Sequence, residues 1–210
     1  MNILVTGAKG MVGTALVNNL KNIRDNKNRT RPGISVNEIF EYDLDSTREE
    51  LDDFCQKADF VFNLAGVNRP EKTEDFMNGN FGFASELLEI LERYQNKATV
   101  MLSSSVQATL SGRFGDSEYG RSKKAGEELF FQYGQKNGVK VAVYRFPNLM
   151  GHSRPKYNSA VGTYLSMSEL LRYNHFGYNP GTHLQHSGPG LTFLLLTGFL
   201  LQPTVQIQTE

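Results

Sequence analysis

Short apolar runs alternate along the chain with longer segments in which apolar residues recur at the spacing of a helix. A short run bounded by turn residues predicts a buried strand, and the longer periodicity predicts an amphipathic helix. The expected strands are residues 2–6, 38–42, 59–64, 99–102 and 140–144. The expected helices are residues 11–20, 47–55, 73–94 and 118–137, with a polar loop over 22–33. This alternation predicts an α/β fold, a doubly wound parallel sheet with helices on both faces.

The pattern changes after about Tyr164, where residues rich in Gly, His, Asn, Gln and Thr precede an apolar run and a polar tail. We therefore expect one domain over residues 1–150 and a partial or divergent segment over 151–210. All four histidines lie at or beyond His152, and no cysteine or carboxylate stands near them at the spacing of metal ligands. No metal site is expected.

The first expected strand runs directly into a glycine-rich turn, TGAKGMVG, over residues 6–13. Gly7 permits a tight turn, Gly10 lets backbone amides approach a pyrophosphate, and Gly13 lets the following helix pack closely. The N-terminus of that helix would then face the anion. Three glycines alone are a weak signal, but their place between a strand and a helix predicts a dinucleotide site.

Acidic residues follow the second expected strand. A carboxylate at the position of Asp43 typically hydrogen-bonds the adenine ribose and disfavours a 2′-phosphate, which favours NAD over NADP. An equal alternative is that Asp43 and Asp45 are solvated loop acids, and Lys9 and Arg69 are candidates for a 2′-phosphate contact. The Ala-Gly pair in residues 63–66 either lets the cofactor pass close to the backbone or simply ends the third strand.

A serine run and a Tyr-xxx-Lys pattern supply candidate chemistry. Ser103, Ser104 and Ser105 follow the fourth expected strand, and Tyr119 opens the next long helix with Lys123 four residues later. Positions i and i+4 share one helix face, and an ammonium beside a phenol lowers the phenol pKa. Tyr119 is then a general acid or base toward a carbonyl or alcohol. The other charges of this helix form i, i+4 pairs expected to be solvated: Arg121, Lys124, Glu127 and Glu128.

Composition restricts the remaining function classes. The 210 residues carry 22 acidic and 22 basic side chains, so no net field indicates a nucleic acid or an anionic membrane as partner. No apolar stretch is long enough for a spanning helix, and the N-terminus lacks a signal-peptide pattern. The single cysteine, Cys55, fits a reducing compartment. A cytoplasmic protein is expected.

Seven segments of the chain resemble one family: TGAKGMVG, DFVFNLAGVNRPE, GNFGFASELLEIL, MLSSSVQATL, YGRSKKAGEELFF, VYRFPNLMG and RPKYNSAVGTY. These segments are similar to extended short-chain dehydrogenases/reductases of the NAD-dependent epimerase/dehydratase group, which have a Rossmann fold. Within that group they most resemble the capsular-polysaccharide reductases of the N-acetyl-L-fucosamine route. The resemblance covers about residues 1–164, and the chain then looks truncated relative to the family.

The resemblance implies a role for each matching position. Ser105, Tyr119 and Lys123 are the catalytic serine, proton donor and ribose-holding lysine, and Asn80 supports the site. The cofactor residues implied are Gly7, Lys9, Gly10, Met11, Val12, Gly13, Asp43, Leu64, Ala65, Gly66, Asn80, Lys123 and Pro147. The substrate residues implied are Asn68, Arg69, Asn148, Arg154, Tyr157 and Asn158, with Ser159 in the same loop.

The leading hypothesis is therefore nicotinamide-dependent reduction of the C4 keto group of a UDP-linked 4-keto-6-deoxy-N-acetylhexosamine. Two alternatives stay open: an epimerase or dehydratase with bound NAD, and a dinucleotide-binding fragment without turnover. The family pattern favours NADPH whereas Asp43 favours NAD, so the cofactor is NADP or NAD. Pairing through the two long helices makes a homodimer a further hypothesis.

Overall fold

A computed structural model describes residues 1–28, 30, 32–67, 71–72, 74–147 and 149. Its centre is a five-stranded, wholly parallel sheet of order β2-β1-β3-β4-β5. The strands are β1 (Ile3–Thr6), β2 (Ile39–Tyr42), β3 (Phe60–Asn63), β4 (Thr99–Ser105) and β5 (Val141–Phe146). The helices are α1 (Met11–Arg24), α2 (Arg48–Lys57), α3 (Glu74–Phe76), α4 (Phe83–Arg93) and α5 (Glu118–Asn137). The predicted doubly wound α/β fold is confirmed.

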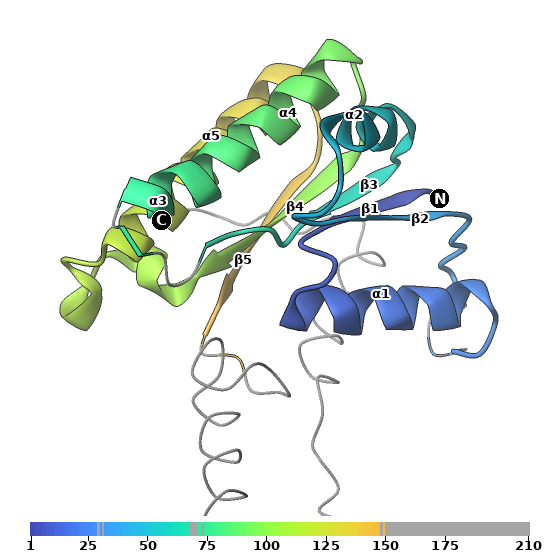
Figure 1. Cartoon of the computed structure of the whole chain (residues 1–210), viewed down its shortest axis with the longest axis horizontal. Helices are drawn as coiled ribbons and strands as arrows, with labels where there is room; N and C mark the ends of the chain where they lie inside the picture. The colour runs from blue at the N-terminus through green and yellow to red at the C-terminus, as the bar shows by residue number, and fades with distance from the viewer. Residues whose placement is uncertain (29, 31, 68–70, 73, 148, 150–210) are drawn as a thin grey trace, which may run out of the picture.

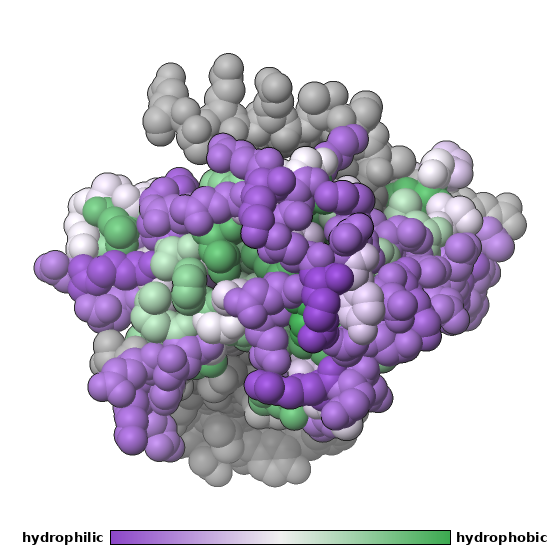
Figure 2. Space-filling model, turned by 90° about the horizontal axis from the view of Figure 1, so that it is seen from above, coloured by the Kyte–Doolittle hydropathy of each residue, from purple (hydrophilic) through white to green (hydrophobic). Residues whose placement is uncertain are grey.

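The sheet separates two hydrophobic layers. Helix α1 covers one face, and α2, α4 and α5 cover the other (Figure 1). Leu16 and Leu20 of α1 pack with Ile3 and Val5 of β1, while Leu4 of the same strand faces the opposite layer. β1 and β3 are buried along their whole length, which explains their continuous apolar runs. Viewed from above, the three-helix layer presents mainly hydrophilic side chains, with hydrophobic ones visible between them (Figure 2).

The strand order of the sheet reverses between β1 and β3. β1 lies between β2 and β3, so the connections after β1 and β3 leave to opposite sides of the sheet. In open parallel sheets, ligands bind at the carboxyl ends of the strands where the order reverses in this way. The glycine turn after β1 and the Ala65–Gly66 segment after β3 flank this point. The topology therefore brings together the segments in which the sequence predicted a cofactor site.

Helix boundaries follow local chemistry. Thr47 and Glu50 form the predicted capping box at the start of α2, each side chain accepting the other's backbone N–H. Gly138 ends α5 in the left-handed conformation, at φ 64°, as predicted. Ser117 caps the start of α5 by accepting the Gly120 N–H. Among the described residues no helix is both long and apolar enough to cross a bilayer.

Five predictions about the elements are wrong by two residues or more, and the first is the end of α2, which continues to Lys57 and not to residue 55. α1 continues to Arg24, because Ile23 extends its buried face and the chain turns only at Asn26, where φ is 57°. β4 continues through Ser105, so the serines belong to the strand rather than follow it. β5 runs two residues further than expected, to Phe146. Pairing of Ser103, Ser104 and Ser105 with β5 lengthens both strands, a long-range effect that periodicity does not contain.

The fifth error concerns the predicted single helix over residues 73–94. The structure divides it into α3, a π-helical segment over Met77–Gly82 and α4. The π-helical turn brings Gly79 against the Val67 side chain and turns Asn80 inward, where it is buried. Single π-helical turns are frequent at functional sites, because they redirect one side chain at the cost of regular hydrogen bonding.

Candidate functional site

The glycine turn has the geometry that the sequence predicted for a phosphate-binding loop. Gly7 adopts φ 69°, and a Cβ there would lie 2.8 Å from the Ala65 nitrogen. A Cβ on Gly13 would overlap the Gly7 carbonyl oxygen, so this glycine permits close approach to the turn itself. Gly10 is the N-cap of α1 and supplies no capping side chain. The first N–H groups of α1, from Met11 and Val12 onward, therefore keep the character of an anion-binding helix N-terminus.

Substituting Gly13 tests this close approach. We expect Gly13→Ala to lower the free energy of unfolding by about 2–3 kcal/mol, because the new methyl meets rigid backbone. It should also weaken nicotinamide dinucleotide binding at least tenfold. Gly82→Ala is the matched control, since its Cβ would meet nothing within 4 Å and its φ of −61° suits any residue. Urea unfolding and fluorescence titration measure both quantities; equal effects of the two variants would contradict the assignment.

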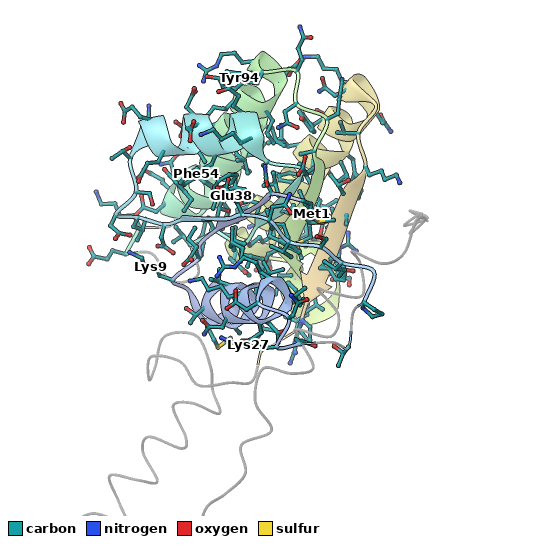
Figure 3. All side chains as sticks on the ribbon, turned by 90° about the vertical axis from the view of Figure 1, so that its right-hand side faces the viewer. Met1, Lys9, Lys27, Glu38, Phe54 and Tyr94 are labelled. Atoms are coloured by element: carbon teal, nitrogen blue, oxygen red, sulfur yellow. The ribbon has the colours of Figure 1, made fainter. Side chains whose placement is uncertain are left out.

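The two acidic residues that follow β2, Asp43 and Asp45, both contact Lys9 of the glycine turn. Asp43 accepts hydrogen bonds from the Lys9 backbone N–H at 2.7 Å and from the Leu44 N–H at 2.8 Å. The Lys9 ammonium, at the edge of the turn (Figure 3), pairs with Asp45, and this hydrogen bond raises the pKa of Lys9. Asp43 therefore ties β2 to the turn rather than standing free as a solvated acid. Lys9, which the sequence offered to a 2′-phosphate, already has a carboxylate partner.

The segment after β3 meets the inward-turned asparagine. A Cβ on Gly66 would lie 2.6 Å from Asn80 Oδ1 and 2.9 Å from Lys123 Nζ, so a larger residue would displace the polar ends of these two side chains. Asn80 accepts the Val67 N–H at 3.0 Å and donates to the Val67 carbonyl and to Ser122 Oγ, both at 3.1 Å. Asn80 thus joins the segment after β3 to the second turn of α5. Leu64, beside it, is partly buried against the α1 layer.

Ser105, Tyr119 and Lys123 come together at the carboxyl end of β4. Tyr119 is hydrogen-bonded to Ser105, and Lys123 Nζ lies 5.7 Å from the centre of the Tyr119 ring. Lys123 is buried and donates to the Ser103 carbonyl at 3.1 Å. Ser105 Oγ also accepts the Gln107 N–H, which begins a short 3₁₀ turn after the strand. The two 3₁₀ turns over Val106–Thr109 and Gly112–Phe114 occupy the loop between Ser105 and Tyr119.

Burial governs the pKa of both titratable groups of this cluster. Burial raises the pKa of the Tyr119 phenol, opposed by the hydrogen bond with Ser105. Burial also lowers the pKa of Lys123 to about 8, from an ordinary 10.5. The expectation that Lys123 lowers the pKa of Tyr119 is therefore wrong for this structure, because the ammonium is directed to the Ser103 carbonyl. A phenol with a raised pKa stays protonated at neutral pH, which suits a proton donor.

A sequence profile of the NAD dependent epimerase/dehydratase family matches residues 3–168. The chain belongs to this family. The resemblance predicted from the seven segments is thereby confirmed.

Relatives of known description support the same family. The chain is 39% identical over 165 residues to a UDP-2-acetamido-2,6-beta-L-arabino-hexul-4-ose reductase of Pseudomonas aeruginosa, covering 78% of this chain and 40% of that protein. It is similar to the capsular polysaccharide assembling protein CapF of Staphylococcus aureus, with TM-score 0.69, 33% identity, and coverage of 99% of this chain and 52% of CapF. MoeE5 in complex with UDP-glucose and NAD is similar with TM-score 0.57 and 26% identity, covering 82% of this chain and 60% of MoeE5. The chain thus spans between 40% and 60% of the length of these proteins.

One prediction for the charged residues of α5 is wrong. Glu127, expected to be solvated, is fully buried. Its carboxylate accepts two hydrogen bonds from Arg145 of β5, at 2.8 and 2.7 Å, and one from Ser104 Oγ at 2.6 Å. Sequence reasoning missed this group, although Glu127 stands four residues after Lys123 on the same buried helix face. Glu128, by contrast, is exposed as expected.

The remaining predicted site residues fall in two groups. Pro147 follows β5 and is exposed. Asn68, Arg69, Asn148, Arg154, Tyr157, Asn158 and Ser159 lie outside the described residues. The four histidines also lie outside them; within the described part, no three His, Cys, Asp or Glu side chains are grouped to hold a metal ion.

Proposed function

We propose that this protein reduces the C4 keto group of a UDP-linked 4-keto-6-deoxy-N-acetylhexosamine with a nicotinamide dinucleotide. The observation that carries the proposal is the Tyr119 phenol, hydrogen-bonded to Ser105 beside Lys123 at the carboxyl edge of the sheet. The named relatives support the substrate class, since one is a reductase of such a sugar nucleotide and another assembles capsular polysaccharide. A place in surface polysaccharide synthesis follows from the same support.

Each catalytic group has a separate task in this proposal. Ser105 and Tyr119 hydrogen-bond the keto oxygen, and Tyr119 donates its proton as the oxygen gains negative charge. A nicotinamide bound at this site would supply the hydride to the keto carbon. Lys123, whose ammonium lies beside the Tyr119 ring, holds the nicotinamide ribose. Reprotonation of the Tyr119 phenolate from solvent restores the site.

The cofactor would lie across the carboxyl ends of β1 and β3. The N-terminus of α1 and the turn formed by Gly7, Gly10 and Gly13 would hold the pyrophosphate. Met11 and Val12 contribute N–H groups to that helix end, and Pro147 lines the nicotinamide side in this assignment. Leu64, Ala65, Gly66 and Asn80 would form the opposite wall. The proposal also includes a domain boundary near residue 150, a homodimer, and the substrate residues Asn68, Arg69, Asn148, Arg154, Tyr157 and Asn158.

We further propose that NADH is preferred over NADPH. Asp43 and Asp45 hold the backbone and ammonium of Lys9, and Glu41 of β2 lies near enough to raise the pKa of Lys9 as well. A 2′-phosphate at this edge would meet three carboxylates, and both lysines there, Lys9 and Lys21, are already paired with Asp45 and Glu41. Like charges in such proximity disfavour binding, whereas ribose hydroxyls can donate to the same carboxylates.

The single buried cysteine agrees with the reducing cytoplasm, where such cofactors and sugar nucleotides occur.

An assay of cofactor oxidation tests the proposed function. With the 4-keto sugar nucleotide, the protein should consume one NADH per sugar reduced, and kcat/KM should be at least tenfold higher with NADH than with NADPH. Absorbance at 340 nm and mass analysis of the sugar measure both. Sugar conversion without net NADH oxidation would instead indicate an epimerase or dehydratase. Saturable cofactor binding without any sugar conversion would indicate a dinucleotide-binding fragment and reject the reductase proposal.

A further inference from the structure

Glu127 is a fully buried carboxylate that the proposed reaction does not use. It lies on α5 and is bonded to two strands at once, to Ser104 of β4 and to Arg145 of β5. Ser104 and Arg145 are register partners in the parallel ladder, so their side chains reach the same point of the sheet face. All three hydrogen bonds are 2.8 Å or shorter. One helix is thereby fixed to the last two strands of the described sheet (Figure 1).

The contact of Glu127 with Ser104 joins the two elements that carry the catalytic cluster, β4 and α5. Ser104 is flanked by Ser103, whose carbonyl accepts from Lys123, and by Ser105, which is bonded to Tyr119. On the helix, Lys123 is one turn before Glu127 and Tyr119 is about one turn before Lys123. A shift of α5 along its axis or about it would therefore change the distance between Tyr119 and Ser105.

Stability alone does not account for this ion pair, in which Glu127 is fully buried while 42% of the Arg145 side chain is exposed. Removing the Glu127 carboxylate from water is costly, and well-packed apolar residues in place of a buried charge and its partner are often neutral or stabilising. The pair offers instead a fixed geometry, because the planar guanidinium of Arg145 bonds both carboxylate oxygens of Glu127. Ser104 then fixes the same carboxylate relative to β4.

We propose that Glu127, with Arg145 and Ser104, is a positioning residue that sets the Tyr119 phenol against Ser105 by locking α5 to the ends of β4 and β5. The proposal rests on the proposed reductase function and adds a residue to it. Misplacement by about 1 Å of a group far from the chemistry can lower a rate about 10²-fold. Lys123 is the one proposed cofactor residue on α5. Loss of the contact between Glu127, Arg145 and Ser104 should therefore lower kcat more than it weakens cofactor binding.

The test replaces the whole pair, so that no charge is left buried without a partner. Glu127→Leu combined with Arg145→Met should leave the thermal midpoint unchanged or higher and the Kd for NADH within twofold, while kcat falls at least tenfold with a smaller change in the sugar KM. The matched control is Glu128→Leu with Lys124→Met, an exposed pair on the same helix, which should leave kcat unchanged. A folded double variant with kcat within twofold of the unaltered protein would overturn the proposal.

A milder variant tests the proposal if the double variant does not fold. Ser104→Ala keeps the ion pair and removes only the bond to β4, and kcat should fall three- to tenfold at an unchanged KM; an unchanged kcat overturns the proposal. If the unaltered protein reduces no sugar nucleotide, the function proposal fails separately. Positioning is then measured by amide hydrogen exchange, where the variants should speed exchange at residues 103–107 more than tenfold but leave β1 unchanged. Exchange at residues 103–107 that is equal in the variants and in the unaltered protein would reject the positioning role of Glu127.

Discussion

Tyr119→Phe is expected to lower kcat for sugar reduction by about 10²–10⁴-fold, the range for removal of a positioned general acid. Only the phenol oxygen is lost, so the ring keeps its contact with Phe76, at 5.7 Å between centres, and its place under Lys123. Folding and the Kd for NADH should therefore change little. Steady-state kinetics at saturating NADH, with a parallel fluorescence titration, measure the separation of catalysis from binding.

A second tyrosine provides the control for this experiment. Tyr94→Phe removes a phenol oxygen that bonds Asp52 on the other side of α4, away from Ser105. Its kcat should equal that of the unaltered protein. If Tyr119→Phe retains activity within a few-fold, the proton comes from another group and the roles assigned to Ser105 and Lys123 lose their basis. A raised Kd for NADH in Tyr119→Phe would show instead that the phenol holds the cofactor.

The fold was largely predictable because its signals are local. Continuous apolar runs identify strands that are buried on both faces, and the strands and helices alternate in the way that parallel sheets require. Capping residues such as Thr47 and Gly138 act within a few positions, so their effect is visible in the sequence. The glycine turn was predictable for the same reason, since its requirement for φ > 0 at Gly7 is a property of that residue.

The errors share a different cause, which is contact between distant segments. β4 extends because Ser103, Ser104 and Ser105 find partners on β5, and the predicted helix over residues 73–94 is interrupted where Asn80 bonds the Val67 backbone. Glu127 looked like one of several helix charges until Arg145, 18 residues away, supplied its partner. Neither a period nor a propensity encodes such pairings.

The candidate cluster illustrates both cases in a few residues. The order of Ser105, Tyr119 and Lys123 along the chain predicted their convergence, because the carboxyl end of β4 and the start of α5 adjoin. Their electrostatics were not predictable, since the depth of burial sets the pKa of Tyr119 and Lys123. Depth depends on Asn80, Gly66 and the sheet edge, which the structure alone brings to this point.

Lys123→Met is expected to stabilise the protein at neutral pH while abolishing reduction. Burial lowers the pKa of Lys123 to about 8 in the folded state, against an ordinary 10.5 when unfolded. Folding thus disfavours the protonated lysine, and a difference of this size corresponds to about 3 kcal/mol of destabilisation at pH 7. Loss of the hydrogen bond to the Ser103 carbonyl offsets about 1 kcal/mol. The net gain in the free energy of unfolding should be about 2 kcal/mol.

The pH dependence of this gain distinguishes it from a simple packing effect. Between about pH 8 and 10.5 the unfolded chain binds more protons than the folded one, so the stability of the unaltered protein rises with pH through that window. The advantage of Lys123→Met should therefore be complete below pH 8 and disappear near pH 10.5. Urea unfolding at pH 7 and pH 10 measures it, with Lys124→Met, an exposed neighbour, as control. A destabilised Lys123→Met at pH 7, or a gain independent of pH, would mean that the lysine is no desolvated cation held for catalysis. We expect a variant that is more stable but inactive. That combination would show that Lys123 destabilises the fold and is needed for the reaction.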